Sequence, residues 1–385
     1  MKDSLFFRVV FVFGFAAIFI GDVKIPVTVP ISMLISAVYL VRIYNVHVTL
    51  PFIFLLGVLL PGLLNLIISG YFDIERDHVI YLPVLYGLYV LLFVGGFTYH
   101  RRLEYALIVG AMALCLWIFM AFFTSFGDAG GYYQLKSHAE TPLGRSNYLA
   151  VFIGFCLMVS TFRFGWSFII LLPAFLLMMS RTGIVLILVF MFFRFITVRQ
   201  NLLRVFSVAA VLLALSIYYW DFIYYYLDYV LEGALGTESV NIRLRAWYAT
   251  IDILQINPLF GVPRSLYKDA LELAVLGDNL WDPHNSVLHL LVSFGLLGFV
   301  FYAAYVAVIF REICQASLTD KFWKGVFWGY SLILVWSLFE QVLLTPAIEI
   351  LQAYLFVLAR KYRSSLYVKS EEHNSKVSLV ELRAS

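Results

Sequence analysis

A histidine and its amide neighbour, His284 and Asn285, stand where a long polar stretch ends and an apolar run begins. After nine intervening residues, the same run reads Gly295-Leu-Leu-Gly298. An imidazole has a reference pKa of about 6.5, so it can accept or donate a proton near neutral pH. At such a boundary this side chain can meet both a water-borne sugar and a lipid-borne headgroup. The pattern therefore predicts proton-transfer chemistry at the mouth of a membrane helix.

Three arginines occupy boundaries of the same kind. Arg145 precedes an apolar run, Arg181 lies in the corner between two such runs, and Arg243 lies in the longest polar segment. A guanidinium group binds phosphate oxygens in pairs, so arginines at headgroup depth suit a lipid-linked phosphate. Taken singly, each has a plainer interpretation: Arg243 as a lipid-phosphate contact, and Arg181 as a topological anchor. The combination with a histidine favours a substrate site.

The composition indicates the kind of protein that holds these residues. The chain has 385 residues, of which 62% are hydrophobic and 13% charged, and its mean hydropathy is +0.89. Soluble domains have roughly 45–50% apolar and about 25% charged residues. The chain is therefore predicted to be a polytopic membrane protein. Its three cysteines are scattered along apolar runs, which indicates neither a disulfide framework nor a metal cluster.

Windows of about 20 mostly apolar residues predict an all-α fold with about twelve membrane helices. The first is interpreted as an uncleaved helix. The windows lie near residues 5–20, 25–44, 50–70, 79–99, 105–126, 147–161, 166–180, 183–197, 202–220, 284–310, 326–344 and 347–358.

Basic residues in the connections predict the orientation of these spans. With the N-terminus inside, two thirds of the 27 Lys and Arg residues lie inside, and most of the 24 acidic residues lie outside. The bias predicts that both termini are cytoplasmic. It also places Arg145, Arg181, Arg243 and His284 together on the outer side. Glu340, near the end of the eleventh span, is interpreted as an outer-rim residue in preference to a functional carboxylate.

The simplest partition is a single membrane domain, residues 1–359, followed by a disordered cytoplasmic tail, residues 360–385. Residues 221–283 are predicted to form a large loop on the outer side, between the ninth and tenth spans. Within this loop, residues 240–255 read as an amphipathic helix that carries Arg243 and Trp247 on one stripe. That helix is expected to lie on the membrane face or over the spans.

Three sequence marks together resemble the bacterial O-antigen ligase and polymerase family. They are Ser180-Arg181-Thr182-Gly183 after an apolar span, Arg243-Leu-Arg-Ala-Trp247 running into Asn257-Pro-Leu-Phe-Gly261, and His284-Asn with Gly295-x-x-Gly298. The resemblance extends over about residues 147–310, and the third mark is the most specific.

The resemblance implies about twelve membrane helices with a helical periplasmic lid. It implies glycan transfer from undecaprenyl diphosphate to an acceptor hydroxyl at the periplasmic face of the bacterial inner membrane, with no nucleotide and no metal cofactor. His284 is implied to be the base or to orient the acceptor, and Arg181 and Arg243 to hold the diphosphate. We add Arg145 to the diphosphate group because it lies just ahead of Asn147. Asn285 and Trp247 are expected to support the site.

The acceptor is left open by the sequence. The spacing from His284 to Gly298 favours an O-antigen ligase that acts on lipid A-core, whereas Trp247 is more common in polymerases that extend lipid-linked repeat units. A transporter or flippase is a more distant alternative. Such proteins place ionisable groups near the midplane and usually carry an internal repeat, whereas the candidate residues of this chain lie at membrane boundaries. The expected partners are the lipid-linked donor, the glycan acceptor, membrane lipids and a chain-length regulator, with no nucleic acid.

Overall fold

The structure is a computed structural model of the 385-residue chain. It describes residues 53–54, 57–58, 102–124, 146–178, 180–197, 237–262, 266–267, 269–271, 283–345, 348–349 and 351–366. All regular structure in these ranges is helical, which confirms the predicted all-α class. The predicted spans near 5–20, 25–44, 79–99 and 202–220 lie outside the described residues, as does Arg145.

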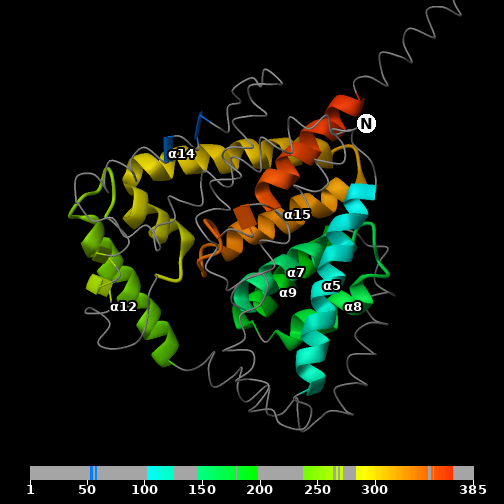
Figure 1. The fold of residues 1–385 in the computed structure, drawn as a ribbon, viewed down its shortest axis with the longest axis horizontal. Coiled ribbons are helices and arrows are strands. Elements are labelled where there is room, and N and C mark those ends of the chain that lie inside the picture. The colour runs from blue at the N-terminus through cyan, green and yellow to red at the C-terminus, as the bar shows by residue number, and fades with distance from the viewer. Residues whose placement is uncertain are drawn as a thin grey trace, which may run out of the picture.

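Four apolar helices form the lower part of the bundle (Figure 1). They are α5 (Arg102–Thr124), α7 (Ser146–Ser160), α8 (Phe168–Leu177) and α9 (Arg181–Thr197). Each begins and ends within three residues of a predicted span, because the charged and polar residues that flank the apolar runs also mark the helix ends. The predicted boundaries are therefore confirmed for this part of the chain, although the number of spans stays a prediction.

Two further helices, α14 (Ser286–Ser317) and α15 (Lys321–Trp336), follow one another along the chain. Among the described residues, α14 is the helix that is both long and apolar enough to cross a membrane, judged by length and composition. Helix α15 ends at Trp336, so the predicted span 326–344 is wrong at its C-terminal end. Residues 337–345, here called the exit turn, leave the helical path because their backbone groups bond to side chains of other segments. A last helix covers residues 351–366, which extends past the predicted span end at 358.

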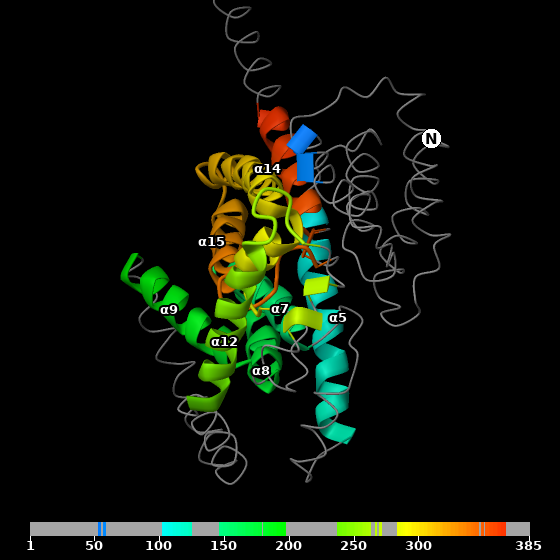
Figure 2. The ribbon, with the colours of Figure 1, turned by 90° about the vertical axis from the view of Figure 1, so that its left-hand side faces the viewer.

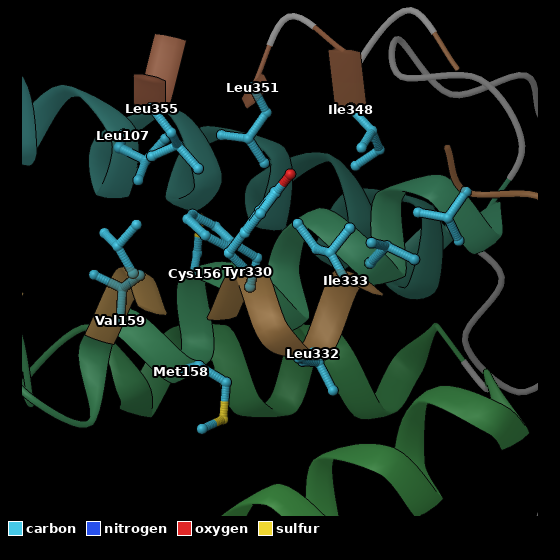
Figure 3. Close-up of a cluster of buried hydrophobic side chains, with 14 of the residues drawn as sticks. Leu107, Cys156, Met158, Val159, Tyr330, Leu332, Ile333, Ile348, Leu351 and Leu355 are labelled. Carbon is cyan, nitrogen blue, oxygen red and sulfur yellow. The ribbon is translucent and has the colours of Figure 1, made fainter. Parts of the chain in front are cut away.

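Glycines allow α15 to approach α7 closely. A Cβ atom at Gly325 would lie 2.8 Å from Val159 Cα, and one at Gly329 would lie 2.9 Å from the carbonyl oxygen of Phe155. Small residues at such positions are typical of membrane helix pairs, whose backbones pack at short range. Figure 3 shows buried side chains of α7, α15 and the C-terminal helix meeting in one apolar cluster.

Helix α12 (Thr237–Leu254) confirms the amphipathic helix that was predicted at 240–255. It lies to one side of the bundle, beside the N-terminal part of α14 (Figures 1 and 2). Its buried face carries Ala246, Thr250 and Ile253, which pack against Val292 and other residues of a small second core. The stripe of Arg243 and Trp247 therefore lies at the edge of this contact.

Polar clusters lie at both ends of α15. At its start, Asp320 caps the helix and pairs with Arg163 at 3.2 Å, and Arg163 also contacts Glu104 at 2.8 Å. At the other end, beyond Trp336, lies Glu340. A helix of 16 residues is about 24 Å long, which is close to the thickness of a bilayer core. Residues assigned by the sequence to the inner and outer sides thus lie at opposite ends of one apolar helix, and the topology itself stays a prediction.

Candidate active site

The predicted span 284–310 placed His284 in the first turn of the helix, but His284 lies just outside α14. The helix begins at Ser286, and Asn285 is its N-cap. The side-chain oxygen of Asn285 accepts hydrogen bonds from the backbone N–H groups of Val287 at 2.9 Å and Leu288 at 3.1 Å. His284 itself has a backbone φ of 47°, which is uncommon for a residue other than glycine. The cap therefore fixes the imidazole at the end of the helix, where a substrate can approach it.

Glu340 joins the predicted histidine to one of the predicted arginines. One carboxylate oxygen lies 3.2 Å from Nδ1 of His284, and the other accepts a hydrogen bond of 2.9 Å from Nη2 of Arg243. A second guanidinium nitrogen, Nη1, donates to the carbonyl oxygen of Phe339 at 3.2 Å. Residues from α12, the entry to α14 and the exit turn thus meet at one point, although they are far apart in the sequence.

The burial of these three side chains differs in a way that matters for chemistry. The side chain of Glu340 is 9% exposed, whereas those of His284 and Arg243 are 30% and 32% exposed. The carboxylate is therefore held inside, and the imidazole and guanidinium groups face accessible space. Because a carboxylate can only accept hydrogen bonds, Nδ1 must donate to it. The lone pair of the neutral imidazole is then on Nε2, which is the nitrogen that can accept a proton from a substrate.

The exit turn is fastened to the start of α14 by the residues that follow His284. The amide nitrogen of the Asn285 side chain donates to Leu338 O at 2.9 Å, and the backbone N–H of Ser286 donates to Ser337 O at 2.8 Å. The Asn285 side chain thus serves both as a helix cap and as a link to the segment that carries Glu340. This geometry supports the prediction that Asn285 is a supporting residue.

Trp247 joins helix α12 to the segment that enters α14. Its indole N–H donates a hydrogen bond of 2.8 Å to the carbonyl oxygen of Pro283, the residue before His284. Arg243 lies one turn earlier on α12, and Arg245 is exposed elsewhere on that helix. The two predicted residues of this stripe therefore both contact the site, one through a charge and the other through an indole donor.

Gly295 breaks α14 and receives the loop that follows α12. Its backbone φ is 65°, and the N–H groups of Leu296 and Leu297 donate to Pro258 O at 2.8 Å and Leu259 O at 3.2 Å. A Cβ atom at Gly295 would lie only 2.2 Å from Leu259 O. Gly295 therefore packs closely against a loop, and this contact joins the second and third sequence marks.

The remaining predicted arginines are only partly covered by the structure. Arg181 is the first residue of α9, but its side chain lies outside the described residues, as does all of Arg145. The start of α9 lies beside the end of α15, because a Cβ atom at Gly183 would meet the ring of Trp336 at 2.3 Å. The start of α9 therefore packs against the last turn of α15, four residues before Glu340 in the sequence.

Glu340 is the residue whose role the sequence reasoning missed. It was predicted to lie at the outer rim, and it was not assigned to the site. The sequence held no specific signal for this role, because most of the 24 acidic residues are predicted on the same outer side.

Residues 166–303, about a third of the chain, match the family described as O-antigen ligase. The chain contains an O-antigen ligase family domain. The matched region includes the start of α9, the Arg243 helix and the mark from His284 to Gly298, and it ends within α14. Glu340 lies beyond it. No curated protein and no solved structure matches the chain.

The O-antigen ligase family domain identifies the broad class of the protein. Members are membrane-embedded glycosyl-transfer enzymes that use lipid-linked glycans. Such an enzyme needs a base for the acceptor hydroxyl and cations for the leaving phosphate. His284 and Arg243 place an imidazole and a guanidinium group within a single hydrogen-bonded group. Within the described ranges, no cluster of three or more His, Cys, Asp or Glu side chains is arranged as a metal site.

Proposed function

We propose that this protein is a glycosyltransferase of the bacterial inner membrane that moves a glycan from undecaprenyl diphosphate to an acceptor sugar hydroxyl on the periplasmic side. The proposed acceptor is lipid A-core, which makes the protein an O-antigen ligase. The observation that supports this most directly is the contact of His284 and Arg243 through one buried carboxylate. The proposed base, His284, and the proposed phosphate-binding cation, Arg243, come from separate segments of the matched region, and Glu340, which joins them, lies beyond it.

In this proposal the acceptor oxygen attacks the anomeric carbon while the bond from that carbon to the diphosphate oxygen breaks. The electron pair leaves with undecaprenyl diphosphate, and attack from the opposite face inverts the anomeric centre. Nε2 of His284 accepts the hydroxyl proton, an effect typically worth roughly 10²–10⁴-fold in rate. Glu340 holds Nδ1 and offsets the positive charge that develops on the imidazole. The enzyme otherwise acts by positioning and electrostatics.

Arg243 can bind the diphosphate without releasing its protein contacts. A guanidinium group has five N–H donors, and Glu340 and Phe339 each take one in the described structure. Its one-third exposure leaves the outer edge of the group accessible to phosphate oxygens. Arg181 and Arg145 are proposed to supply further positive charge. For Arg181, the closeness of the start of α9 to Trp336 supports this role.

The remaining parts of the proposal follow from the sequence. They are about twelve spans, cytoplasmic termini, and a periplasmic loop whose helix α12 covers the site as a lid. Neither a metal nor a nucleotide is required. A chain-length regulator is a proposed further partner, and the lipid tail is proposed to lie along the spans. The family domain favours this enzyme over the transporter and flippase alternatives.

The test is complementation of a strain that lacks the protein, with a gel of its surface polysaccharide as the readout. His284→Ala should leave normal amounts of protein in the membrane and no transferred glycan. Arg243→Lys should be strongly impaired, because a lysine cannot bind two phosphate oxygens in the same way. Arg245→Lys, two residues along α12 and exposed, is the matched control and should behave as wild type. Normal polysaccharide from His284→Ala would discard the assignment of the base.

A polymerase is the second candidate, and Trp247 favours it. The indole of Trp247 contacts the entry to α14, so the residue type at this position belongs to the site itself. The lipid-linked material that accumulates in the strain without the protein separates the two activities. Long undecaprenyl-linked chains indicate a ligase, whereas single repeat units indicate a polymerase.

A further inference from the structure

The hydroxyl group of Ser286 is a buried junction between α14 and the exit turn. It donates to the carbonyl oxygen of Glu340 at 3.0 Å and accepts from the backbone N–H groups of Val342 at 2.8 Å and Leu343 at 3.1 Å. Ser286 has no exposed surface. One hydroxyl therefore satisfies three backbone groups of the exit turn, at Glu340 itself and at the second and third residues after it.

A second buried side chain holds the other end of the same turn. One carboxylate oxygen of Glu349 accepts from the backbone N–H of Leu344 at 3.0 Å, from the side chain of Gln352 at 3.0 Å and from the hydroxyl group of Tyr302. Glu349 is 1% exposed. Leu344 has a backbone φ of 65°, a left-handed conformation that a leucine rarely adopts.

The buried carboxylate of Glu349 and the left-handed backbone of Leu344 both cost free energy, which residues that only filled the core would not require. A carboxylate among apolar helices is disfavoured, and replacing such groups by apolar residues often stabilises a protein. A leucine in a left-handed conformation is strained and persists only where its surroundings fix it. The arrangement therefore favours a role in holding the exit turn in one conformation.

We propose that Ser286 and Glu349 are positioning residues for glycan transfer, and that they act by fixing the exit turn so that Glu340 keeps its contacts to His284 and Arg243. Neither residue touches the substrate in this proposal. The inference rests on the proposed function, because the reaction is what makes the position of Glu340 important. A displacement of about 1 Å in a catalytic group can reduce a rate by roughly 10²-fold.

The test uses three variants and two matched controls in the full-length protein. Ser286→Ala and Glu349→Leu remove the contacts to the exit turn, whereas Glu349→Gln keeps an oxygen that can accept from Leu344. Ser337→Ala is the control for the serine, because its buried hydroxyl bonds only to Leu334 O within its own helix turn. Tyr330→Phe is the control for Glu349, because the Tyr330 hydroxyl belongs to the same polar cluster but bonds to Gln352.

Two measurements are made on each variant: the initial rate of glycan transfer per amount of folded protein, and hydrogen exchange of the backbone in residues 337–345. Ser286→Ala and Glu349→Leu should exchange faster in this segment and transfer at least about tenfold more slowly. Glu349→Gln should recover most of the rate, and both controls should match wild type. Unchanged exchange in Ser286→Ala and Glu349→Leu overturns the proposal.

A double variant separates positioning from general damage. If Glu349 acts through Glu340, then Glu349→Leu combined with Glu340→Gln should be no slower than Glu340→Gln alone. Losses that multiply instead overturn the proposal. Failure of the proposed function has a different signature, since His284→Ala would then transfer as well as wild type. The exchange data would still report whether Ser286 and Glu349 hold the turn.

Discussion

Replacing Gly295 by alanine should detach the loop that follows α12 from helix α14. The position requires glycine for two reasons. Its backbone, with φ of 65° and ψ of −174°, lies in a region that only glycine populates readily. The space for a side chain is also taken by backbone atoms, since a Cβ atom would lie 2.2 Å from Leu259 O and 2.5 Å from Phe260 N. Backbone atoms cannot rotate away as a flexible side chain can.

The expected loss of stability follows from these contacts. Forcing a residue with a side chain into this region costs about 1–3 kcal/mol. The displaced loop would also lose the hydrogen bonds from Leu296 to Pro258 and from Leu297 to Leu259, each worth about 1 kcal/mol. Together these terms lower the free energy of unfolding by about 3–5 kcal/mol. Transfer should fall as well, because this loop anchors the helix that carries Arg243.

The measurement is unfolding of the detergent-purified protein, with surface polysaccharide as the second readout. Gly110→Ala is the matched control, since Gly110 lies inside α5 and no atom is found within 4 Å of its Cβ position. That change should be neutral or stabilise the helix by about 0.5–1 kcal/mol. The reasoning is refuted if Gly295→Ala is no less stable than Gly110→Ala.

Three further predictions concern contacts around the site and away from it. Asn285→Ala removes the cap of α14 and should lower the unfolding free energy by about 1 kcal/mol, with reduced transfer on the polysaccharide gel. Trp247→Phe removes the donor to Pro283 and should slow transfer in a rate assay while the amount of protein in the membrane is unchanged. Arg163→Ala leaves Glu104 buried without its cation and should destabilise the protein by about 3–5 kcal/mol in the unfolding assay. Transfer per folded molecule should remain normal in that variant, because this pair lies at the far end of α15.

Long apolar runs made the positions of the helices predictable, but they did not predict where α15 ends. The bounds of α5 and α7 follow from where charged and polar residues interrupt the hydrophobic pattern. The end of α15 does not, because the first charged residue after Trp336 is Glu340, four residues further on. Beyond Glu340, hydrogen bonds to the side chains of Ser286 and Glu349 hold the backbone of Val342, Leu343 and Leu344. Hydropathy describes a residue's own preference for lipid and contains no information about such partners.

The sequence predicted the basic residues of the site but not the hydrogen bonds that join them. Periodicity placed Arg243 and Trp247 on one stripe of a helix, and in the structure Arg243 contacts Glu340 of the exit turn and Trp247 contacts Pro283 at the entry to α14. The spacing after His284 identified a histidine at a helix mouth, but the cap at Asn285 sets where the imidazole points. Glu340 could not be joined to His284 from the sequence, since the path between them runs along two helices and a turn of irregular backbone.

The charges of the described group indicate why one arginine is not sufficient for the proposed donor. Arg243 carries one positive charge, and the buried carboxylate of Glu340 already balances it. A lipid-linked diphosphate brings about two negative charges into a partly desolvated place, where unpaired charge is expensive. The imidazole of His284 cannot supply the missing positive charge, because it must be neutral to act as the base. Further cations must therefore come from other segments at the same end of α15. Arg181 is the natural source in the proposed site, because α9 begins beside Trp336, where its N-terminal N–H groups also favour an anion.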